Sequence, residues 1–404
     1  MEAIEATRRV VARGSTPREQ GKSLGTAAKD KIRELYDLKV RQYDAAGALA
    51  RWDEIVAGAA PLMERFTPHT FEELRGQAEG AGMDEHALLR LATEYEISMD
   101  LRGNVSGGKC TGLLSHRLMH RPGVQVIGQN NDENPAVWAD GKLDIIVEHR
   151  APPANVADHS REGATPLDCV LYTHPGIPAY MGLNSNGLGV TWFYIDDSAS
   201  ERATTTGLPT CVLLRELLTF PSALAAASWL RSVPRAVPNA YMLADPIQSF
   251  EIECMPSRWA ATAHPPPEDA SLARPVSLTP GAELYGGFHA NHFTVDLENV
   301  GNDAGDPYAD KLGGSGVRGE AMAKSIATGM SMGRLGLEEA KTALSAAPVH
   351  RVTGSTLVSL VFEPTTKSLH ARFKGDAETE WITCSLEEPE TIQEVTERVA
   401  AAAL

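Results

Sequence analysis

The sequence of 404 residues contains few cysteines, and they form no recognisable ligand pattern. The five are Cys110, Cys169, Cys211, Cys254 and Cys384. Because no two form a Cys-x-x-Cys pair or a Cys/His ligand spacing, the sequence predicts no zinc site, and we expect neither a metal nor a cofactor. An odd, sparse set of cysteines is also typical of a reducing compartment rather than of a disulfide framework.

Positive charge and long apolar runs are also scarce. The formal net charge is −16, and an acidic protein lacks the basic surface that nucleic acids and anionic membranes require. No run of about 18 apolar residues occurs, and residues 1–14 lack the apolar core of a signal peptide. No glycine-rich phosphate loop follows a predicted strand. We therefore expect a cytoplasmic protein whose partners include no nucleic acid and no membrane.

What the sequence does contain changes in character near residue 105. Residues 1–105 are mainly helical in pattern after a short opening strand, with helical apolar spacing across residues 17–38 and again near 71–81 and 84–95. Thr70 and Asp84 are the residues expected to cap the last two of these helices. Beyond residue 108 the pattern changes to strands.

The second part alternates groups of strands with pairs of helices. An Asn-Gly turn predicts a hairpin at residues 180–194. Two helices are expected at 209–232, two more at 318–346 and a last one at 388–402, with strands between them. The other strands are expected at 111–119, 124–129, 143–148, 167–172, 240–244, 250–254, 259–263, 357–362 and 369–373. Such an order favours a layered sandwich of sheets and helices.

The most informative segment is residues 103–111, where a glycine-rich stretch leads to Lys109, Cys110 and Thr111 at the start of a strand. Glycines give the backbone freedom for the Lys109 carbonyl to approach the Cys110 thiol. Attack of the thiol would move the peptide bond to a thioester, and water would then release Cys110 as a new N-terminus. Its α-amine, with a pKa of about 7.7–8.0, could take the thiol proton. The local pattern also fits a buried structural cysteine.

Several segments together resemble the penicillin acyltransferase family, the acyl-CoA:6-aminopenicillanate acyltransferases and their relatives. Cys110 with Thr111 is similar to the family's processing site, and residues 128–132 match its Gln-Asn-x-Asp pattern. The other matching segments are residues 13–21, 175–178, 182–190, 207–209, 214–218, 239–245 and 289–293.

The resemblance implies an α+β fold, the four-layer αββα sandwich of self-processing N-terminal-nucleophile (Ntn) hydrolases. It also implies a mainly helical pro-segment, residues 1–109, packed on a catalytic chain, residues 110–404. The two fragments would stay associated. Three positions depart from the family. Lys109 stands where glycine is common, and Asn131 and Glu133 stand where relatives often carry Trp or Phe. Penicillin chemistry itself is therefore not expected.

The resemblance assigns roles to several residues. Cys110 is the nucleophile, Asp132 holds the new amine, and Asn239 donates to the oxyanion. The alternative roles are a turn cap before residues 134–135 for Asp132 and a strand-entry turn for Asn239. Thr111, Asn130 and Arg318 are expected to support the site or bind substrate, although an exposed helix position would also suit an arginine such as Arg318.

We thus expect an amidohydrolase that cleaves a small N-acyl or N-aminoacyl amide through an acyl-enzyme. An N-acyltransferase, possibly using coenzyme A, is the alternative, because the pattern does not distinguish water from an amine as acceptor. Two further hypotheses are an ordinary cysteine protease with a Cys–His pair and an unprocessed, non-catalytic binding protein. His116, His174, His289 and His292 are discounted as partners, since the family mechanism needs no histidine.

Overall fold

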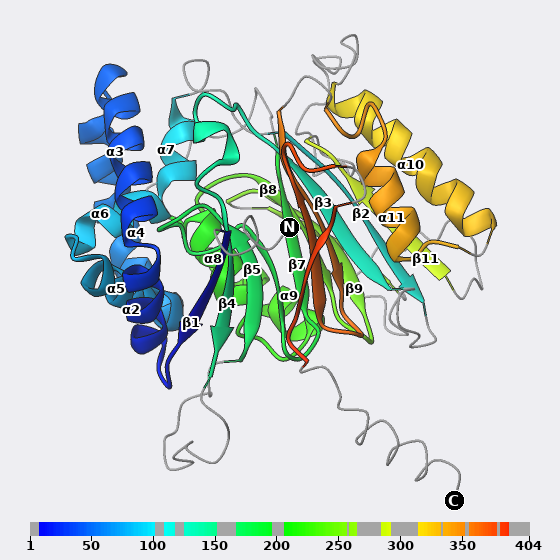
Figure 1. Cartoon of the computed structure of the whole chain (residues 1–404), viewed down its shortest axis with the longest axis horizontal. Coiled ribbons are helices and arrows are strands. Elements are labelled where there is room, and N and C mark those ends of the chain that lie inside the picture. Colours follow the sequence, from blue (N-terminus) through cyan, green and yellow to red (C-terminus); the bar gives the residue numbers. More distant parts are fainter. Residues whose placement is uncertain are drawn as a thin grey trace, which may run out of the picture.

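The computed structural model describes residues 8–101, 109–117, 125–151, 167–195, 206–256, 258–264, 284–291, 314–332, 334–351, 355–377 and 380–387. In these residues two β-sheets pack face to face, and helices cover the outer face of each sheet (Figure 1). The arrangement is a four-layer αββα sandwich, so the fold class expected from the sequence is confirmed.

One sheet has eight strands in the order β1-β4-β5-β6-β7-β8-β9-β10. Neighbours in it are antiparallel except β1 and β4, which run parallel. Its strands are β1 (Arg9–Arg13), β4 (Ile145–Arg150), β5 (Cys169–Thr173), β6 (Met181–Asn184), β7 (Gly189–Tyr194), β8 (Asn239–Ala244), β9 (Ser249–Cys254) and β10 (Trp259–His264). The predicted hairpin is β6–β7, and Gly187 takes the positive φ of 84° in its turn that favours glycine.

The other sheet has six strands in the order β11-β2-β3-β12-β13-β14 and is antiparallel throughout. Its strands are β2 (Lys109–Arg117), β3 (Val126–Asp132), β11 (Leu284–His289), β12 (Thr356–Glu363), β13 (Ser368–Phe373) and β14 (Ile382–Ser385). A short 3-10 turn, η1 (Ala139–Gly141), lies between β3 and β4. The central pair β2–β3 carries the candidate nucleophile.

Helices of the first 101 residues cover the eight-stranded sheet on the left of Figure 1. They are α2 (Pro17–Ala27), α3 (Lys29–Ala45), α4 (Leu49–Phe66), α5 (Pro68–Ala81), α6 (Glu85–Ala92) and α7 (Glu94–Asp100). Two details of the sequence prediction are wrong. The segment 17–38 is broken at Ala28, whose φ of −103° and ψ of 11° are not helical. The segment 84–95 is broken at Thr93.

The predicted helix caps have different outcomes. Asp84 is confirmed, because its carboxylate accepts a hydrogen bond from the His86 backbone N–H at 2.8 Å. Thr70 is not a cap, because α5 already begins at Pro68, and proline suits a first-turn position where its missing N–H costs nothing. The Thr70 hydroxyl instead donates to Glu216 Oε2 at 2.6 Å.

Helices α2 and α5 cross so closely that each presents glycines to the other. A Cβ atom on Gly21 would lie 2.0 Å from the Glu73 carbonyl oxygen, and one on Gly76 would lie 2.0 Å from the Arg18 carbonyl oxygen. Gly25 shows the same close approach to the backbone of α5. Because α2 follows β1 directly, this contact joins α5 to the edge of the eight-stranded sheet.

The remaining helices complete the layers. Helices α8 (Thr210–Leu217) and α9 (Ala223–Ser232) add to the first helical layer, with α9 against β8 and β9. Helices α10 (Ser315–Ser331) and α11 (Leu337–Ser345) form the other outer layer, on the right of Figure 1, and pack on β11, β2, β3 and β12. None of the helices in the described residues is long and apolar enough to cross a membrane.

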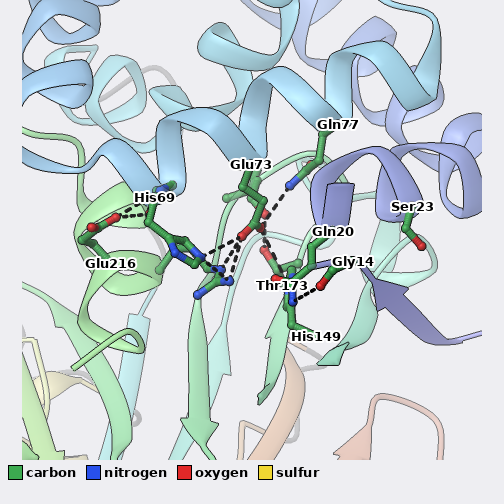
Figure 2. Close-up of polar contacts among 12 residues, drawn as sticks. Gly14, Gln20, Ser23, His69, Glu73, Gln77, His149, Thr173 and Glu216 are labelled. Atoms are coloured by element: carbon green, nitrogen blue, oxygen red, sulfur yellow. Dashed lines mark hydrogen bonds and ion pairs between the residues drawn. The ribbon is translucent and has the colours of Figure 1, made fainter. Parts of the chain in front are cut away.

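The segment 1–109 is joined to the rest by a strand, by apolar packing and by buried charge. Strand β1 is an edge strand of the eight-stranded sheet, and residues of α2–α7 share one apolar core with both sheets. Figure 2 shows His69, Glu73 and Gln77 of α5 facing His149 of the sheet below. Here the buried Glu73 carboxylate pairs with Arg215 of α8 at 2.7 Å.

Three predicted features lie outside the described residues. They are residues 103–108 of the glycine-rich stretch, His292 and the last helix at 388–402.

Candidate active site

Cys110 is the second residue of β2 and is almost fully buried. It lies opposite Asn131 of β3, and Gly112 lies opposite Gln129. Directly opposed residues of an antiparallel pair share a face, and Cys110 belongs to the apolar core between the two sheets. Its thiol, Gln129 and Asn131 therefore lie on the inner face of the six-stranded sheet.

Asn291 holds the backbone nitrogen of Cys110. Asn291 Oδ1 accepts the Cys110 N–H at 2.8 Å, and Asn291 Nδ2 donates to the Tyr194 carbonyl oxygen at 2.7 Å. The Asn291 backbone N–H in turn donates to Ser315 Oγ at 2.7 Å. The orientation of the Asn291 amide is thus determined at both its oxygen and its nitrogen. A cut before Cys110 would liberate the Cys110 nitrogen, which already faces Asn291 Oδ1. The sequence prediction gave Asn291 no role.

Arg318 of helix α10 contacts both Cys110 and Asn291. Its Nη2 donates to Asn291 Oδ1 at 2.7 Å and to the Cys110 carbonyl oxygen at 3.3 Å, and its Nε donates to Thr111 Oγ1 at 2.7 Å. Arg318 is 0% exposed, so the alternative of an exposed helix arginine is wrong. The structure therefore brings together Cys110, Thr111 and Arg318 among the predicted site residues.

The surroundings of the Cys110 thiol oppose its ionisation. Burial raises the pKa of the thiol far above its usual value, and the nearby carboxylates of Glu133 and Asp132 raise it further. The amide of Gln129 and the charge of Arg318 lower it only in part. In the uncut chain the thiol is protonated at neutral pH, so a nucleophilic role requires a proton acceptor.

Gln129 links the thiol to the opposite sheet. Its Oε1 accepts the Trp192 backbone N–H of β7 at 3.1 Å, which fixes which end of the amide carries the donor. Its Nε2 has no hydrogen-bond partner in the described part of the chain, and Gln129 lowers the pKa of the Cys110 thiol. Gln129 is 0% exposed, so this donor has no competition from bulk water.

Two other predicted residues of β3 point away from the thiol. Asp132 pairs with Lys109 and so lies on the outer face, where its Oδ1 accepts the Thr356 hydroxyl at 2.5 Å. It acts on Cys110 through its charge. Asn130 donates to the carbonyl oxygens of Leu344 and Val349 at 2.8 and 3.2 Å and so braces the end of α11.

Asn239 is the first residue of β8 rather than a residue before it. Its Nδ2 donates to Thr210 Oγ1 at 2.9 Å and to Tyr241 Oη at 3.4 Å, and its Oδ1 accepts the Tyr95 hydroxyl at 3.1 Å. Tyr95 also interacts electrostatically with Cys110, so Asn239 is linked to the thiol only indirectly. To donate to an oxyanion, Asn239 Nδ2 would have to release either Thr210 Oγ1 or Tyr241 Oη.

A buried polar group of α3 and α7 lies next to this site. Lys39 Nζ pairs with Glu94 Oε1 at 2.8 Å and lies 3.2 Å from the centre of the Trp138 ring. The Tyr43 hydroxyl donates to the same Glu94 oxygen at 2.7 Å. Glu133 interacts electrostatically with Lys39 and Glu94 as well as with Cys110. Buried charges of the segment 1–109 are therefore coupled electrostatically, through Glu133, to the candidate nucleophile.

Three of the four histidines that were considered as partners of Cys110 lie within the described residues, and each contacts another group. His289 contacts Glu253 Oε1 at 2.7 Å and the Ala290 carbonyl at 2.6 Å. His174 Nδ1 contacts Asp144 Oδ1 at 2.6 Å, and its ring stacks on Trp138. His116 Nδ1 contacts Gln125 Nε2 at 2.9 Å. These contacts give no support to a Cys–His pair. Among the described residues no group of three or more His, Cys, Asp or Glu side chains could hold a metal.

Comparisons with known proteins find distant structural likeness alone. No family model and no curated protein matches the chain. The solved structures that match include two single-residue variants of conjugated bile acid hydrolase from Clostridium perfringens. They are 11% and 12% identical, with TM-scores of 0.39 and 0.40, over 69% of this chain and 92% of theirs. Penicillin V acylase from Agrobacterium tumefaciens matches at 12% identity and a TM-score of 0.34, over 68% of this chain and 78% of its own. What this chain does has to follow from its own side chains.

Proposed function

We propose that the chain cuts its own Lys109–Cys110 bond and then uses Cys110 to cleave a small amide through an acyl-enzyme. The observation that carries this proposal is the separate anchoring of the two functional atoms of Cys110. The backbone nitrogen is held by Asn291 Oδ1 at 2.8 Å, while the thiol lies on the inner face beside Gln129. A structural cysteine would need neither contact.

Self-cleavage needs only groups already at Cys110. The thiol sulfur attacks the Lys109 carbonyl carbon, an S–C bond forms, and the C–N bond to Cys110 breaks. The thiol proton passes to the departing nitrogen, which becomes an amine. Water then hydrolyses the thioester, leaving a carboxylate on Lys109 and a free thiol on Cys110. Arg318 and Asn291 keep the new terminal residue in place through its carbonyl and its nitrogen.

Turnover repeats the chemistry on a substrate. The α-amine accepts the thiol proton, the thiolate attacks the substrate carbonyl, and the amine passes the proton to the leaving nitrogen. Gln129 Nε2 stabilises the thiolate, which burial otherwise disfavours. Water finally releases the acyl group. Holding amine and thiol on one rigid strand end keeps the two groups in reacting geometry.

Intact-mass analysis of the purified protein tests the proposal. Cleavage yields fragments of 109 and 295 residues, since 404 − 109 = 295, and Cys110→Ala leaves one chain. Incubation with an N-acyl p-nitroanilide, with and without an added amine, measures hydrolysis and separates it from acyl transfer. A chain that stays intact, and whose thiol resists an acyl-mimicking electrophile, would instead be a binding protein on this scaffold.

A further inference from the structure

The buried carboxylates that interact electrostatically with Glu133 have partners supplied by the protein itself. Asp144 accepts the Tyr172 hydroxyl and contacts His174 Nδ1, both at 2.6 Å. Glu94 is paired with Lys39 at 2.8 Å, and Asp132 accepts the Thr356 hydroxyl. Each of these three carboxylates therefore has a donor or a cation from the fold itself.

Glu133 has no such partner. It is 8% exposed, and its carboxylate forms no hydrogen bond or ion pair with any described residue. Only its backbone is fixed, through the N–H that donates to the Ser355 carbonyl oxygen at 2.8 Å. It stands directly after Asp132, the last residue of β3. A buried carboxylate without a partner is costly unless a ligand supplies one or the group is protonated.

Other buried acceptors beside Glu133 also lack donors. Asn131 Oδ1 and Glu94 Oε2 form no hydrogen bond in the described part of the chain. The orientation of the Asn131 amide is determined by Tyr172: its hydroxyl hydrogen is used by Asp144, so its oxygen accepts Asn131 Nδ2 at 3.3 Å. Asn131 Oδ1 therefore remains an acceptor, directly opposite Cys110. These free acceptors suit a ligand that carries several hydrogen-bond donors.

We propose that the acyl group transferred to Cys110 carries an ammonium group, which Glu133 and Asn131 Oδ1 bind. The substrate class is then an aminoacyl amide rather than a plain acyl amide, and this inference rests on the proposed function. An ammonium supplies three N–H donors and the positive charge that Glu133 lacks. Lys39 does not compete for Glu133, because it is held by Glu94 and by the Trp138 ring.

The ammonium belongs to the acyl side, and the acyl chain is short. The acyl group stays in the protein after the first step, whereas the leaving amine must reach solvent, and Glu133 is almost completely buried. Cys110 lies opposite Asn131, and Glu133 is two residues further along. Such diagonal neighbours are about 7–8 Å apart between Cα atoms. This span suits an amino group only a few bonds from the carbonyl.

The test uses matched pairs of p-nitroanilides with equal numbers of non-hydrogen atoms. Glycyl is compared with propionyl, β-alanyl with butyryl, and 4-aminobutyryl with pentanoyl. We expect kcat/KM to favour the charged member of the best pair by about 10²-fold, the usual scale for one buried charge pair. In Glu133→Gln this preference falls to near unity, because the rate for the charged member of each pair falls relative to the rate for its uncharged partner. The exposed Glu338→Gln serves as control and keeps the preference.

A second variant keeps the carboxylate at position 133 but changes its distance from the backbone. Glu133→Asp withdraws the carboxylate by one methylene, so the preferred chain becomes longer, as from β-alanyl to 4-aminobutyryl. A wild-type preference for the uncharged substrates, or a preference that survives unchanged in Glu133→Gln, overturns the inference. If the fragments form and uncharged anilides are hydrolysed, that result leaves the proposed function standing. An uncut chain that hydrolyses neither class rejects both.

Discussion

The side-chain oxygen of Asn291 accepts the backbone N–H of Cys110 at 2.8 Å, across 181 residues of sequence. Arg318 donates to the same oxygen at 2.7 Å. One amide thus connects the residue that would become the new terminus to a fully buried guanidinium. In the proposed enzyme this oxygen holds the α-amine that accepts the thiol proton.

Replacing Asn291 by alanine should slow both self-cleavage and turnover. The amine loses its acceptor and can rotate away from the thiol, and misplacement of this kind costs about 10²-fold in rate. The time course of fragment formation by mass spectrometry and the kcat of the cleaved protein measure the two effects.

Asn186→Ala provides the matched control, because Asn186 is an exposed turn residue far from Cys110 in the sequence. It should process and turn over like the wild type. Wild-type rates in Asn291→Ala would show that the contact at Cys110 N has no part in the chemistry.

Gln129→Leu should raise the pKa of the Cys110 thiol still further. Gln129 lowers this pKa, whereas burial, Glu133 and Asp132 raise it. Without it the thiolate forms only at higher pH, so the acid limb of the kcat profile and of iodoacetamide alkylation both move upward. Gln42→Leu, whose amide contacts the Val137 carbonyl at 3.2 Å instead, is the control. An unmoved acid limb in Gln129→Leu would remove Gln129 from the thiol's environment.

The fold was largely predictable from the sequence because its signals are local. Alternating apolar residues, the Asn-Gly turn at Gly187 and the cap at Asp84 each depend on a few neighbouring residues. Two strands went unpredicted. Strand β11 carries an adjacent pair of glycines, and β14 has only four residues, so neither has a clear period. The breaks at Ala28 and Thr93 carry no proline or glycine.

The site was harder to predict because it depends on register and on distant contacts. A spacing of 22 residues places Asp132 on the strand beside Cys110 but leaves the register undetermined. The observed register sets Asp132 opposite Lys109, on the other face from the thiol. Asn291 lies in one of the segments that resemble the family, and that segment is the signal that could have identified it. The buried position of Arg318 depends on how α10 packs, which no local pattern reports.

The stability of the protein should depend on pH through Glu133. Burial, with Glu94 adding to it, raises the pKa of Glu133 to about 8, whereas an unfolded glutamate titrates near pH 4.3. Between these values the folded protein binds more protons, so the free energy of unfolding falls as pH rises, by up to about 1.4 kcal/mol per pH unit for this group. Burial raises the pKa of Glu96 to about 7 and acts in the same direction.

Thermal melts of Glu133→Gln against the wild type at pH 5 and pH 8.5 measure this dependence. The variant has no charge to bury, so it should gain stability relative to the wild type at the higher pH. His69 and His149, whose pKa values burial lowers, act in the opposite direction below about pH 6.5, but both proteins contain them. An equal difference in Tm at both pH values would contradict the raised pKa.

The ion pair between Glu73 and Arg215 should be essential for stability. Both side chains are about 1% exposed, and their atoms lie 2.7 Å apart across the boundary between segments 1–109 and 110–404. Removing one partner of such a pair leaves a buried charge and costs about 3–5 kcal/mol. Urea unfolding of Glu73→Gln and Arg215→Met, both made in Cys110→Ala to keep one chain, measures the loss.

Two further variants separate the loss of this buried ion pair from a general effect of substitution on stability. The double variant Glu73→Leu with Arg215→Met should recover much of the lost stability, because no charge remains buried. Glu79→Gln, which breaks the exposed pair with Arg18, should leave the midpoint unchanged. A single variant as stable as the parent would mean that the pair is not desolvated.

The N-terminal sequence of the larger fragment in catalytically active protein tests the central claim most directly. Cleavage before Cys110 predicts a terminus that begins Cys-Thr-Gly-Leu-Leu, with both fragments in the active peak of a sizing column. Active protein that remains one polypeptide, with its amino terminus at or near Met1, would contradict the claim, since Cys110 would then have no amine to accept its proton.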